Sequence, residues 1–333
     1  LLWDGVVQGV LLLAAETRLT PTEAQPWAPL EALARLLMPS LVRQRERQML
    51  DQSLAATRSD LEQARAASQA LQRYLPAYLR AHGAQLAGDP GRAAACPVLF
   101  GQLFGLSLER LSRVETLAAL QAYYARVRNA LALHHGELAR ILGTQWVGQF
   151  PGAPDSALFG VLTLNQMLLA FRDDQAAGLA AGLGTGLGLH QGALLGGTLD
   201  AGDHVEPVLL GEGMQVAQRL AAMSITFRTG ALVSEELVQT LATPEEFDLR
   251  ALGTYRVGAG EKRIGVFELF SLRAGATLEA MRSLQDHWRE AIQRFRAGHW
   301  REAAEGFESY LAHLPHDRPA RHFLRQCRQR AGR

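Results

Sequence analysis

Residues 136–150, GELARILGTQWVGQF, constrain the fold of this chain more than any other stretch. Apolar residues fill two short arms on either side of Gly143, Thr144 and Gln145, and glycine at the tip can take the positive φ that a hairpin turn demands. Residues 114–135 before this segment and 157–171 after it have helical periodicity. The pattern therefore predicts a helix, a hairpin with an exposed tip and a second helix at the centre of an α/β domain.

The length of 333 residues allows two or three domains, and the apolar and charged fractions are those of an ordinary globular protein. A formal net charge of +1 gives no reason to expect nucleic acid or an anionic membrane as a partner. Cys96 and Cys327 lie far apart, so neither a disulfide framework nor a zinc cluster is indicated, and we expect a cytoplasmic protein. Residues 1–15 are too short and too interrupted to span a bilayer, and no other stretch is a candidate.

The N-terminal segment, residues 1–48, predicts a strand pair within residues 1–16 and a long helix from about residue 30, which Pro39 should kink or briefly break. A strand pair with an exit helix cannot bury a core alone. We therefore interpret the segment as the end of a small sensor domain, and it resembles the end of a GAF domain. Because the first residue is Leu rather than Met, we expect a fragment that starts mid-domain.

Residues 49–82 continue the helix with a narrow apolar seam whose members step by four and three: Leu50, Leu54, Thr57, Leu61, Ala64, Ser68, Leu71 and Leu75. This period favours a parallel two-stranded coiled coil over a solvated connector helix, although the small and polar members weaken the seam. Either structure, leaving a sensor and entering a second domain, is typical of a signalling relay. Residues 83–97 are rich in Gly and Ala and predict a linker.

Residues 182–192, GLGTGLGLHQG, superficially resemble a dinucleotide-binding loop. Their glycines alternate strictly, whereas a dinucleotide fingerprint has spacings of two and then three and lies at the start of a helix. The alternation instead predicts a strand with one nearly bare face, against which other backbone or a partner packs closely.

The C-terminal segment, residues 278–330, predicts a separate tail of amphipathic helices with a turn at residues 296–299. The spacing of its apolar residues resembles one tetratricopeptide unit with its following helix. Since one unit cannot bury a continuous core, we expect the tail to dock on the preceding domain or on a partner protein.

Residues 98–271 resemble the class III adenylate/guanylate cyclase catalytic domain. Five segments carry the resemblance, in family order: VLFGQLFGLS, GELARILGTQWVGQF, TGLGLHQG, GEGMQVAQRL and LGTYRVGAGEKRIGVFEL. The resemblance implies an α+β, ferredoxin-like core. It also implies head-to-tail dimerisation with sites shared between two chains, and ATP or GTP as the nucleotide.

The metal-binding positions of the family are altered in this chain. Cyclisation of ATP or GTP in this family needs two aspartates to hold two divalent ions, Mg²⁺ or Mn²⁺. By the resemblance, the aspartate positions are Gln102 and Thr144, which are neutral. We therefore expect no intact metal site and no cofactor, with Mg²⁺ or Mn²⁺ required only if the domain is active.

Other positions of the family site are partly kept. The resemblance assigns Arg140 and Val208 to the base-selecting positions, Gln215 to the transition-state asparagine and Arg219 to the transition-state arginine. For Arg219 two interpretations stay open: residual phosphate binding, or covering the dimer seam. Residues 258–260, Gly-Ala-Gly, replace a phosphate-binding lysine of the terminal hairpin.

The favoured interpretation is a catalytically degenerate cyclase domain in a homodimer that relays a signal from sensor to partner. An active cyclase with atypical ligands, and a pseudo-subunit that lends Arg219 to an active partner chain, are the alternatives. Acidic residues near element ends could rebuild a metal site, although solvated acids and caps are usual at such positions: Asp155, Asp173, Asp174, Asp200, Asp203, Glu206 and Glu212.

Overall fold

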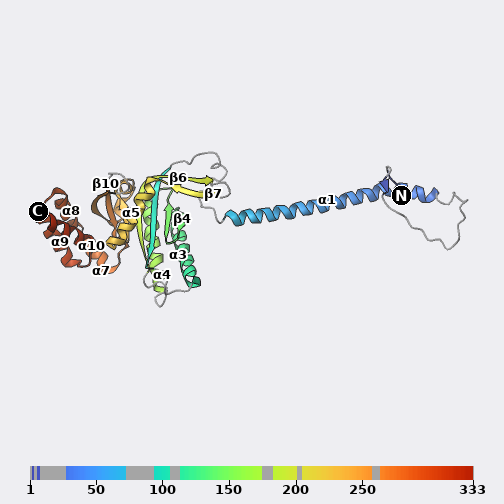
Figure 1. Cartoon of the computed structure of the whole chain (residues 1–333). Coiled ribbons are helices and arrows are strands. Elements are labelled where there is room, and N and C mark those ends of the chain that lie inside the picture. Colours follow the sequence, from blue (N-terminus) through green and yellow to red (C-terminus); the bar gives the residue numbers. More distant parts are fainter. Residues whose placement is uncertain are drawn as a thin grey trace. The chain divides into compact units, whose positions relative to one another are not determined.

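The computed structural model describes residues 2–3, 6–7, 28–72, 94–105, 113–174, 183–200, 205–256 and 263–332 (Figure 1). Contacts between residues divide the chain into two compact units, Leu1–Tyr74 and Leu75–Arg333. In the first unit, β1 (Leu2–Trp3) pairs antiparallel with β2 (Val6–Val7), so the predicted strand pair is present in short form. The remainder of the predicted sensor remnant up to residue 27 lies outside the described residues.

Helix α1 (Ala28–Gln72) is a single helix of 45 residues. It continues through Pro39, so the predicted break does not occur. A proline removes one backbone donor, and the intact hydrogen-bonded turns on both sides suffice to keep the segment helical. The helix also crosses the predicted boundary between residues 48 and 49, which means that one element joins the two predicted segments.

The second unit is built on an eight-stranded sheet, and its neighbouring strands pair in the order β4-β5-β3-β6-β8-β10-β9, with β7 paired to β6. The β6–β8 pair is parallel, whereas the other pairs are antiparallel. Its strands are β3 (Ala94–Phe104), β4 (Glu137–Leu142), β5 (Gln145–Gln149), β6 (Gly184–Asp200), β7 (Val205–Leu210), β8 (Ala231–Ser234), β9 (Leu249–Arg256) and β10 (Arg263–Leu269). Since β3 begins at Ala94, the last residues of the predicted linker 83–97 belong to a strand.

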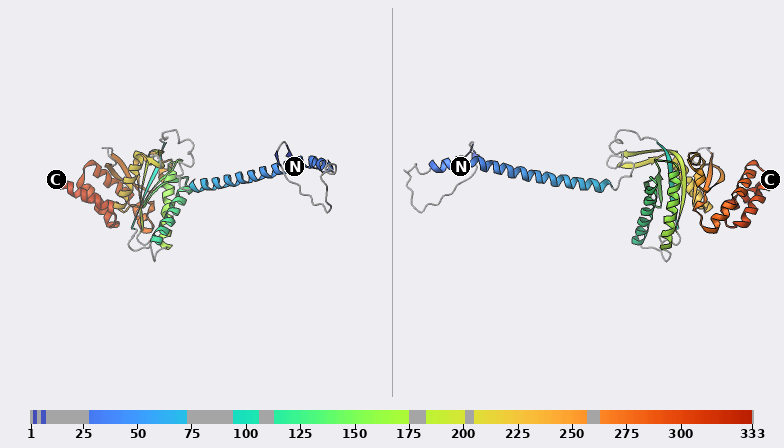
Figure 2. Two further views of the ribbon diagram at one scale, coloured as in Figure 1. Left: turned by 45° about the vertical axis from the view of Figure 1, so that its right-hand side comes forward. Right: turned by 180° about the vertical axis from the view of Figure 1, so that it is seen from behind.

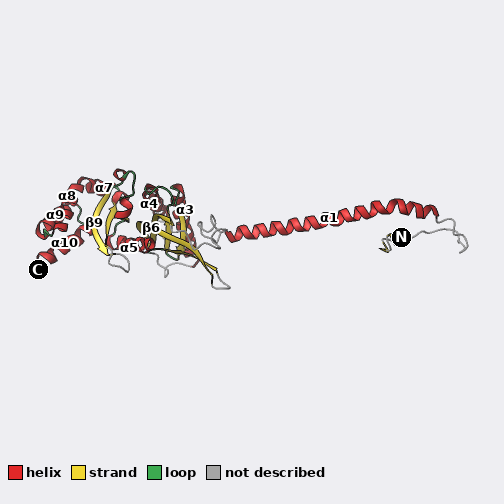
Figure 3. Cartoon of the chain, turned by 90° about the horizontal axis from the view of Figure 1, so that it is seen from above, coloured by secondary structure: helices red, strands yellow, loops and turns green. Residues whose placement is uncertain are grey.

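Helices cover both faces of this sheet. Figure 3 shows α3 (Arg113–Leu133) and α4 (Asp155–Asp174) on one side of β6 and α5 (Glu212–Phe227) on the other. Alternate residues of β3 supply the two cores. Leu99 and Leu103 pack into the cluster that contains α3 and α4, whereas Val98 and Phe100 pack with α5. The short helix α6 (Glu235–Val238) follows β8 and is capped by the Ser234 hydroxyl, which accepts a hydrogen bond from the Leu237 amide.

The glycines of β6 allow α5 to lie directly on the strand. A Cβ atom at Gly188 would overlap the backbone oxygen of Ala217 and the backbone nitrogen of Ala221, and one at Gly186 would meet the Ala221 oxygen. No side chain of another type fits there without moving the helix backbone. The predicted bare-faced strand is confirmed, and a phosphate-binding loop is not formed.

The tail consists of α7 (Gly275–Ser283), α8 (Gln285–Ala297), α9 (Trp300–His313) and α10 (Arg318–Ala331) (Figure 2). The predicted turn is confirmed, since Gly298 has φ 83° at the end of α8. Trp288, Phe307 and Phe323 share one buried cluster with Leu252 and Val266 of the sheet. The tail is therefore part of the same compact unit as the sheet, and of the two docking places expected for it the structure shows the preceding domain, because its apolar face completes the core over β9 and β10.

Candidate functional site

Gln102 and Thr144, the two positions assigned to metal ligands, lie next to each other. Gln102 stands opposite Gln145 in the β3–β5 register, and the amide of Leu103 donates a hydrogen bond of 2.8 Å to the Thr144 carbonyl. Gln102 is half-buried and Thr144 is exposed at the tip of the β4–β5 hairpin. The fold thus brings the two sequence-predicted positions together, near the C-terminal end of β3.

The hairpin tip is fixed by contacts that the sequence pattern did not indicate. Gly143 has φ 64°, as expected, and its carbonyl accepts a hydrogen bond of 2.6 Å from the Tyr124 hydroxyl on α3. The buried Trp146 indole donates to the Tyr123 hydroxyl at 2.9 Å, and that hydroxyl lies 3.1 Å from the Thr185 hydroxyl on β6. The tip is therefore attached to both α3 and the centre of the sheet.

The donor set at this place does not fit a pair of divalent ions. An amide and a hydroxyl are neutral, whereas hard cations are held in proteins mainly by carboxylates. Among the described residues, no group of three or more His, Cys, Asp or Glu side chains is arranged to hold a metal ion.

Asp155, one of the acids considered as a replacement ligand, has a structural role. Its carboxylate accepts hydrogen bonds from the amides of Ala242 and Thr243 at 2.9 and 3.0 Å and from the Thr243 hydroxyl at 3.0 Å. Burial acts to raise the pKa of Asp155, but these hydrogen bonds outweigh it and the pKa is lowered. This carboxylate therefore ties the start of α4 to the loop after α6.

The remaining candidate acids do not add a cluster. Glu212 is exposed in the first turn of α5. Asp203 lies outside the described residues, as do the side chains of Asp173, Asp174, Asp200 and Glu206.

Arg140 and Val208, the base-selecting positions, lie on strands that do not pair with each other. Arg140 is on β4, opposite Val147 and next to a register shift in the β4–β5 ladder. Val208 is on β7, opposite Gly197. Both are half-buried. The isopropyl group of Val208 offers no hydrogen bond to a purine edge, so base selection of the usual kind has no donor or acceptor from this side chain.

Gln215 and Arg219 lie one turn apart on α5, so they share a face of the helix. Both are exposed, whereas Val216, Ala217 and Leu220 on the opposite face of the helix are completely buried. Gln215 and Arg219 therefore lie on the solvent-exposed face of α5.

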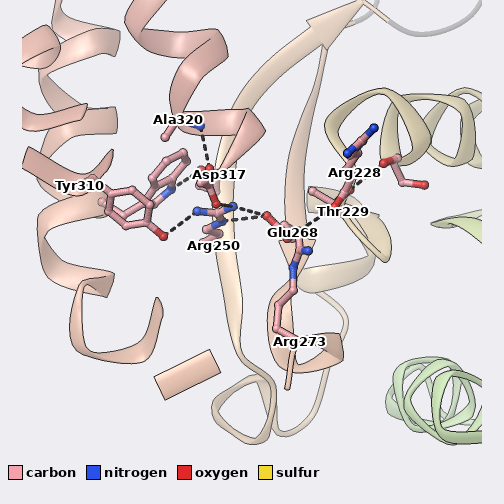
Figure 4. Close-up of polar contacts among 11 residues, drawn as sticks. Arg228, Thr229, Arg250, Glu268, Arg273, Tyr310, Asp317 and Ala320 are labelled. Atoms are coloured by element: carbon pink, nitrogen blue, oxygen red, sulfur yellow. Dashed lines mark hydrogen bonds and ion pairs between the residues drawn. The ribbon is translucent and has the colours of Figure 1, made fainter. Parts of the chain in front are cut away.

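A buried charge network joins the sheet to the tail and was not predicted (Figure 4). Arg250 on β9 donates to Glu268 on β10 at 2.8 Å, to Asp317 at 2.7 Å and to the Tyr310 hydroxyl at 2.8 Å. Its guanidinium carbon lies 4.3 Å from the centroid of the Trp288 ring. The only sequence signal for this network is that Arg250 and Glu268 are charged residues with apolar neighbours along the chain.

The relatives of the chain are cyclases. It is 24% identical over 168 residues to an adenylate cyclase of Anabaena cylindrica, across 48% of this chain and 33% of that protein. It is 25% identical over 220 residues to adenylate cyclase 1 of Rhizobium meliloti (strain 1021), across 62% of this chain and 33% of that protein. The chain thus spans about a third of the length of the curated relatives that it matches. No protein-family model matches it.

Solved structures support the same fold. A bacterial light-regulated adenylyl cyclase superimposes with a TM-score of 0.58 at 19% identity, over 68% of each chain. None of the described helices is long and apolar enough to cross a membrane. The predicted α+β class is confirmed, and the domain that begins with β3 is similar in sequence to adenylate cyclases and in fold to a solved adenylyl cyclase, which supports the resemblance to the class III adenylate/guanylate cyclase catalytic domain.

Proposed function

We propose that this domain is a catalytically degenerate cyclase that acts as a dimeric signalling module. The observation that carries the proposal is the pair Gln102 and Thr144, brought side by side by β3 and the β4–β5 hairpin with no carboxylate at either position. Removal of one well-placed electrostatic stabiliser typically costs about 10²–10³ in rate, and here the anchors of two metal ions are replaced together. In this proposal the cytoplasmic homodimer transmits a conformational change from α1 to the domain and its tail.

A pseudo-subunit is the second candidate, and the exposed face of α5 favours it. Gln215 and Arg219 point outward together, where they can reach the site of another chain. In a heterodimer with an active cyclase, Arg219 would stabilise the phosphates while the partner supplied the aspartates. An active enzyme using ATP or GTP with atypical ligands is the third candidate, suggested by the names of the two curated relatives.

Cyclic nucleotide production by the purified chain separates these candidates. ATP and GTP are each supplied with Mg²⁺ and then Mn²⁺, for the natural sequence, for Arg219→Ala and for Gln102→Asp combined with Thr144→Asp. We expect no product from the natural sequence. Product that disappears in Arg219→Ala would overturn the degenerate reading of the site.

The double aspartate variant gives the positive control for the fold. If only this variant produces cyclic nucleotide, the substitutions at Gln102 and Thr144 are the cause of the lost activity. If it is silent, the cleft has been abandoned and the protein partner carries the function. Mixing the natural chain with a cyclase that lacks its own transition-state arginine tests the pseudo-subunit, which predicts activity only in the mixture.

A further inference from the structure

A cavity of about 390 Å³ lies between the tail and the last two strands of the sheet. One wall is formed by β9 and β10, and the other by α8, α9 and α10. Its described lining contains none of the six positions assigned above to metal, base or transition-state contacts. The tail creates this cavity, because the tail helices supply half of its wall.

Four arginines line the cavity: Arg256 from β9, Arg263 from β10, Arg296 from α8 and Arg330 from α10. Arg256 and Arg263 stand opposite each other in the strand register. The described lining includes no Asp or Glu, and none of the four forms an ion pair within the described part of the chain. The four side chains are exposed at the rim of the cavity. Guanidinium groups are always charged, so four of them around one cavity repel one another, and an anion would relieve that repulsion.

Two further features prepare this cavity for a ligand. The guanidinium carbon of Arg330 lies 4.6 Å from the centroid of the Trp300 ring and 5.5 Å from that of Phe295, which holds the charge in place. Tyr255 also lines the cavity, and its hydroxyl is buried without a hydrogen-bond partner among the described residues. Burial raises the pKa of Tyr255, so its hydroxyl stays a neutral donor that lacks an acceptor.

We propose that this cavity binds a small phosphorylated ligand of the nucleotide class. Guanidinium groups form paired hydrogen bonds with phosphate oxygens, and Arg rather than Lys is the usual choice for such recognition. The volume falls within the range of small-molecule sites, and the aromatic walls suit the apolar part of a phosphate ester. This site is separate from the cleft of the proposed function and does not depend on it.

Titration calorimetry of the full chain tests the site, with inorganic diphosphate and ADP as probes. The variant Arg296→Gln/Arg330→Gln removes two charges from the cavity. Its matched control, Arg289→Gln/Arg294→Gln, removes two charges from α8, the helix that carries Arg296, where Arg289 and Arg294 do not line the cavity and pair with Asp286 and Glu290. We expect the cavity variant to weaken binding at least about tenfold and the control to leave it nearly unchanged. ADP binding more tightly than diphosphate identifies a nucleotide, and equal affinities identify the phosphate group as the recognised part.

Three outcomes would overturn the proposal. The first is that neither probe binds to the natural chain. The second is that the cavity variant and its control weaken binding equally. The third is that binding is lost only in Arg219→Gln, which would place the ligand in the cleft of the proposed function. If circular dichroism shows that the cavity variant does not fold, Arg256→Gln/Arg263→Gln removes the charges of the opposite wall and decides the question.

Discussion

At the scale of single residues, Gly188 allows the backbone of α5 to lie directly against β6. We predict that Gly188→Ala destabilises the fold by about 1–3 kcal/mol, because its Cβ would meet the backbone of α5, which cannot rotate away as a side chain can. Urea denaturation followed by circular dichroism measures the change. The control is Gly152→Ala, since a Cβ at the exposed Gly152 has no atom within 4 Å. Equal stabilities for the two variants would mean that α5 does not lie on β6 as described.

Asp155 is the residue whose ionisation should matter for stability. Its pKa is lowered in the folded state, so its contribution is complete above the unfolded value of about 3.9 and is lost as the pH falls through the folded value. We predict that Asp155→Ala lowers the free energy of unfolding by about 1.5–3 kcal/mol at neutral pH, since a charged acceptor of three hydrogen bonds is removed.

The pH dependence separates this carboxylate from an ordinary surface acid. The difference between the natural chain and Asp155→Ala should shrink as the pH falls below about 4. The control is Asp286→Ala, whose side chain is 88% exposed and pairs only with Arg289 in the described structure. If the difference in free energy of unfolding between the natural chain and Asp155→Ala does not depend on pH, then lost packing, and not the lost charge, causes the destabilisation.

At the scale of elements, the junction between sheet and tail depends on Arg250. We predict that Arg250→Ala destabilises the domain by about 3–5 kcal/mol, because Glu268 is completely buried and would lose its main partner. The control is Arg282→Ala, which breaks a surface pair with Asp248 and should leave the denaturation midpoint close to that of the natural chain. A similar denaturation midpoint for both variants would contradict this prediction, because it would mean that water reaches the Glu268 carboxylate freely.

Local patterns were enough to predict the elements and the hairpin, because each depends on neighbours in sequence. Residues 136–150 formed the expected strands, and the alternating glycines of β6 correctly indicated a bare face. Docking of the tail on the preceding domain was one of two expectations, but the residues that form the junction were not predictable in the same way. Arg250 and Asp317 are 67 residues apart, and only the folded chain shows that they share one buried carboxylate–guanidinium network.

The candidate site was predictable from the sequence, whereas the arginine-lined cavity was not. Gln102 and Thr144 were identified by resemblance, and the pairing of β3 with β5 then placed them together. The arginine-lined cavity had no sequence signal, because its four arginines come from two strands and two helices whose contacts are set by packing. Each arginine by itself looks like a solvated surface residue.

At the scale of the whole molecule, α1 is the element whose partner is still to be identified. It has 45 residues, and Leu50, Leu54 and Leu61 of its seam are between 50% and 63% exposed. Long isolated helices gain little stability by themselves, and a 3.5-residue apolar period is the pattern that a second helix covers. A second copy of the chain is the partner that a parallel coiled coil needs.

We therefore predict that the full chain is a dimer and that Leu54→Glu/Leu61→Glu raises its dissociation constant at least about a hundredfold, or about 2.8 kcal/mol, because two charges would be buried in the seam. Sedimentation equilibrium gives this constant directly. The control is Ser59→Glu/Ala66→Glu, which adds the same two charges on the opposite face of the helix, where a coiled coil is solvated. If the seam variant and the control associate equally, α1 is a solvated connector, and any dimer must form through the cyclase domain. That outcome would contradict a relay through paired helices, since the two α1 helices would then move independently of each other.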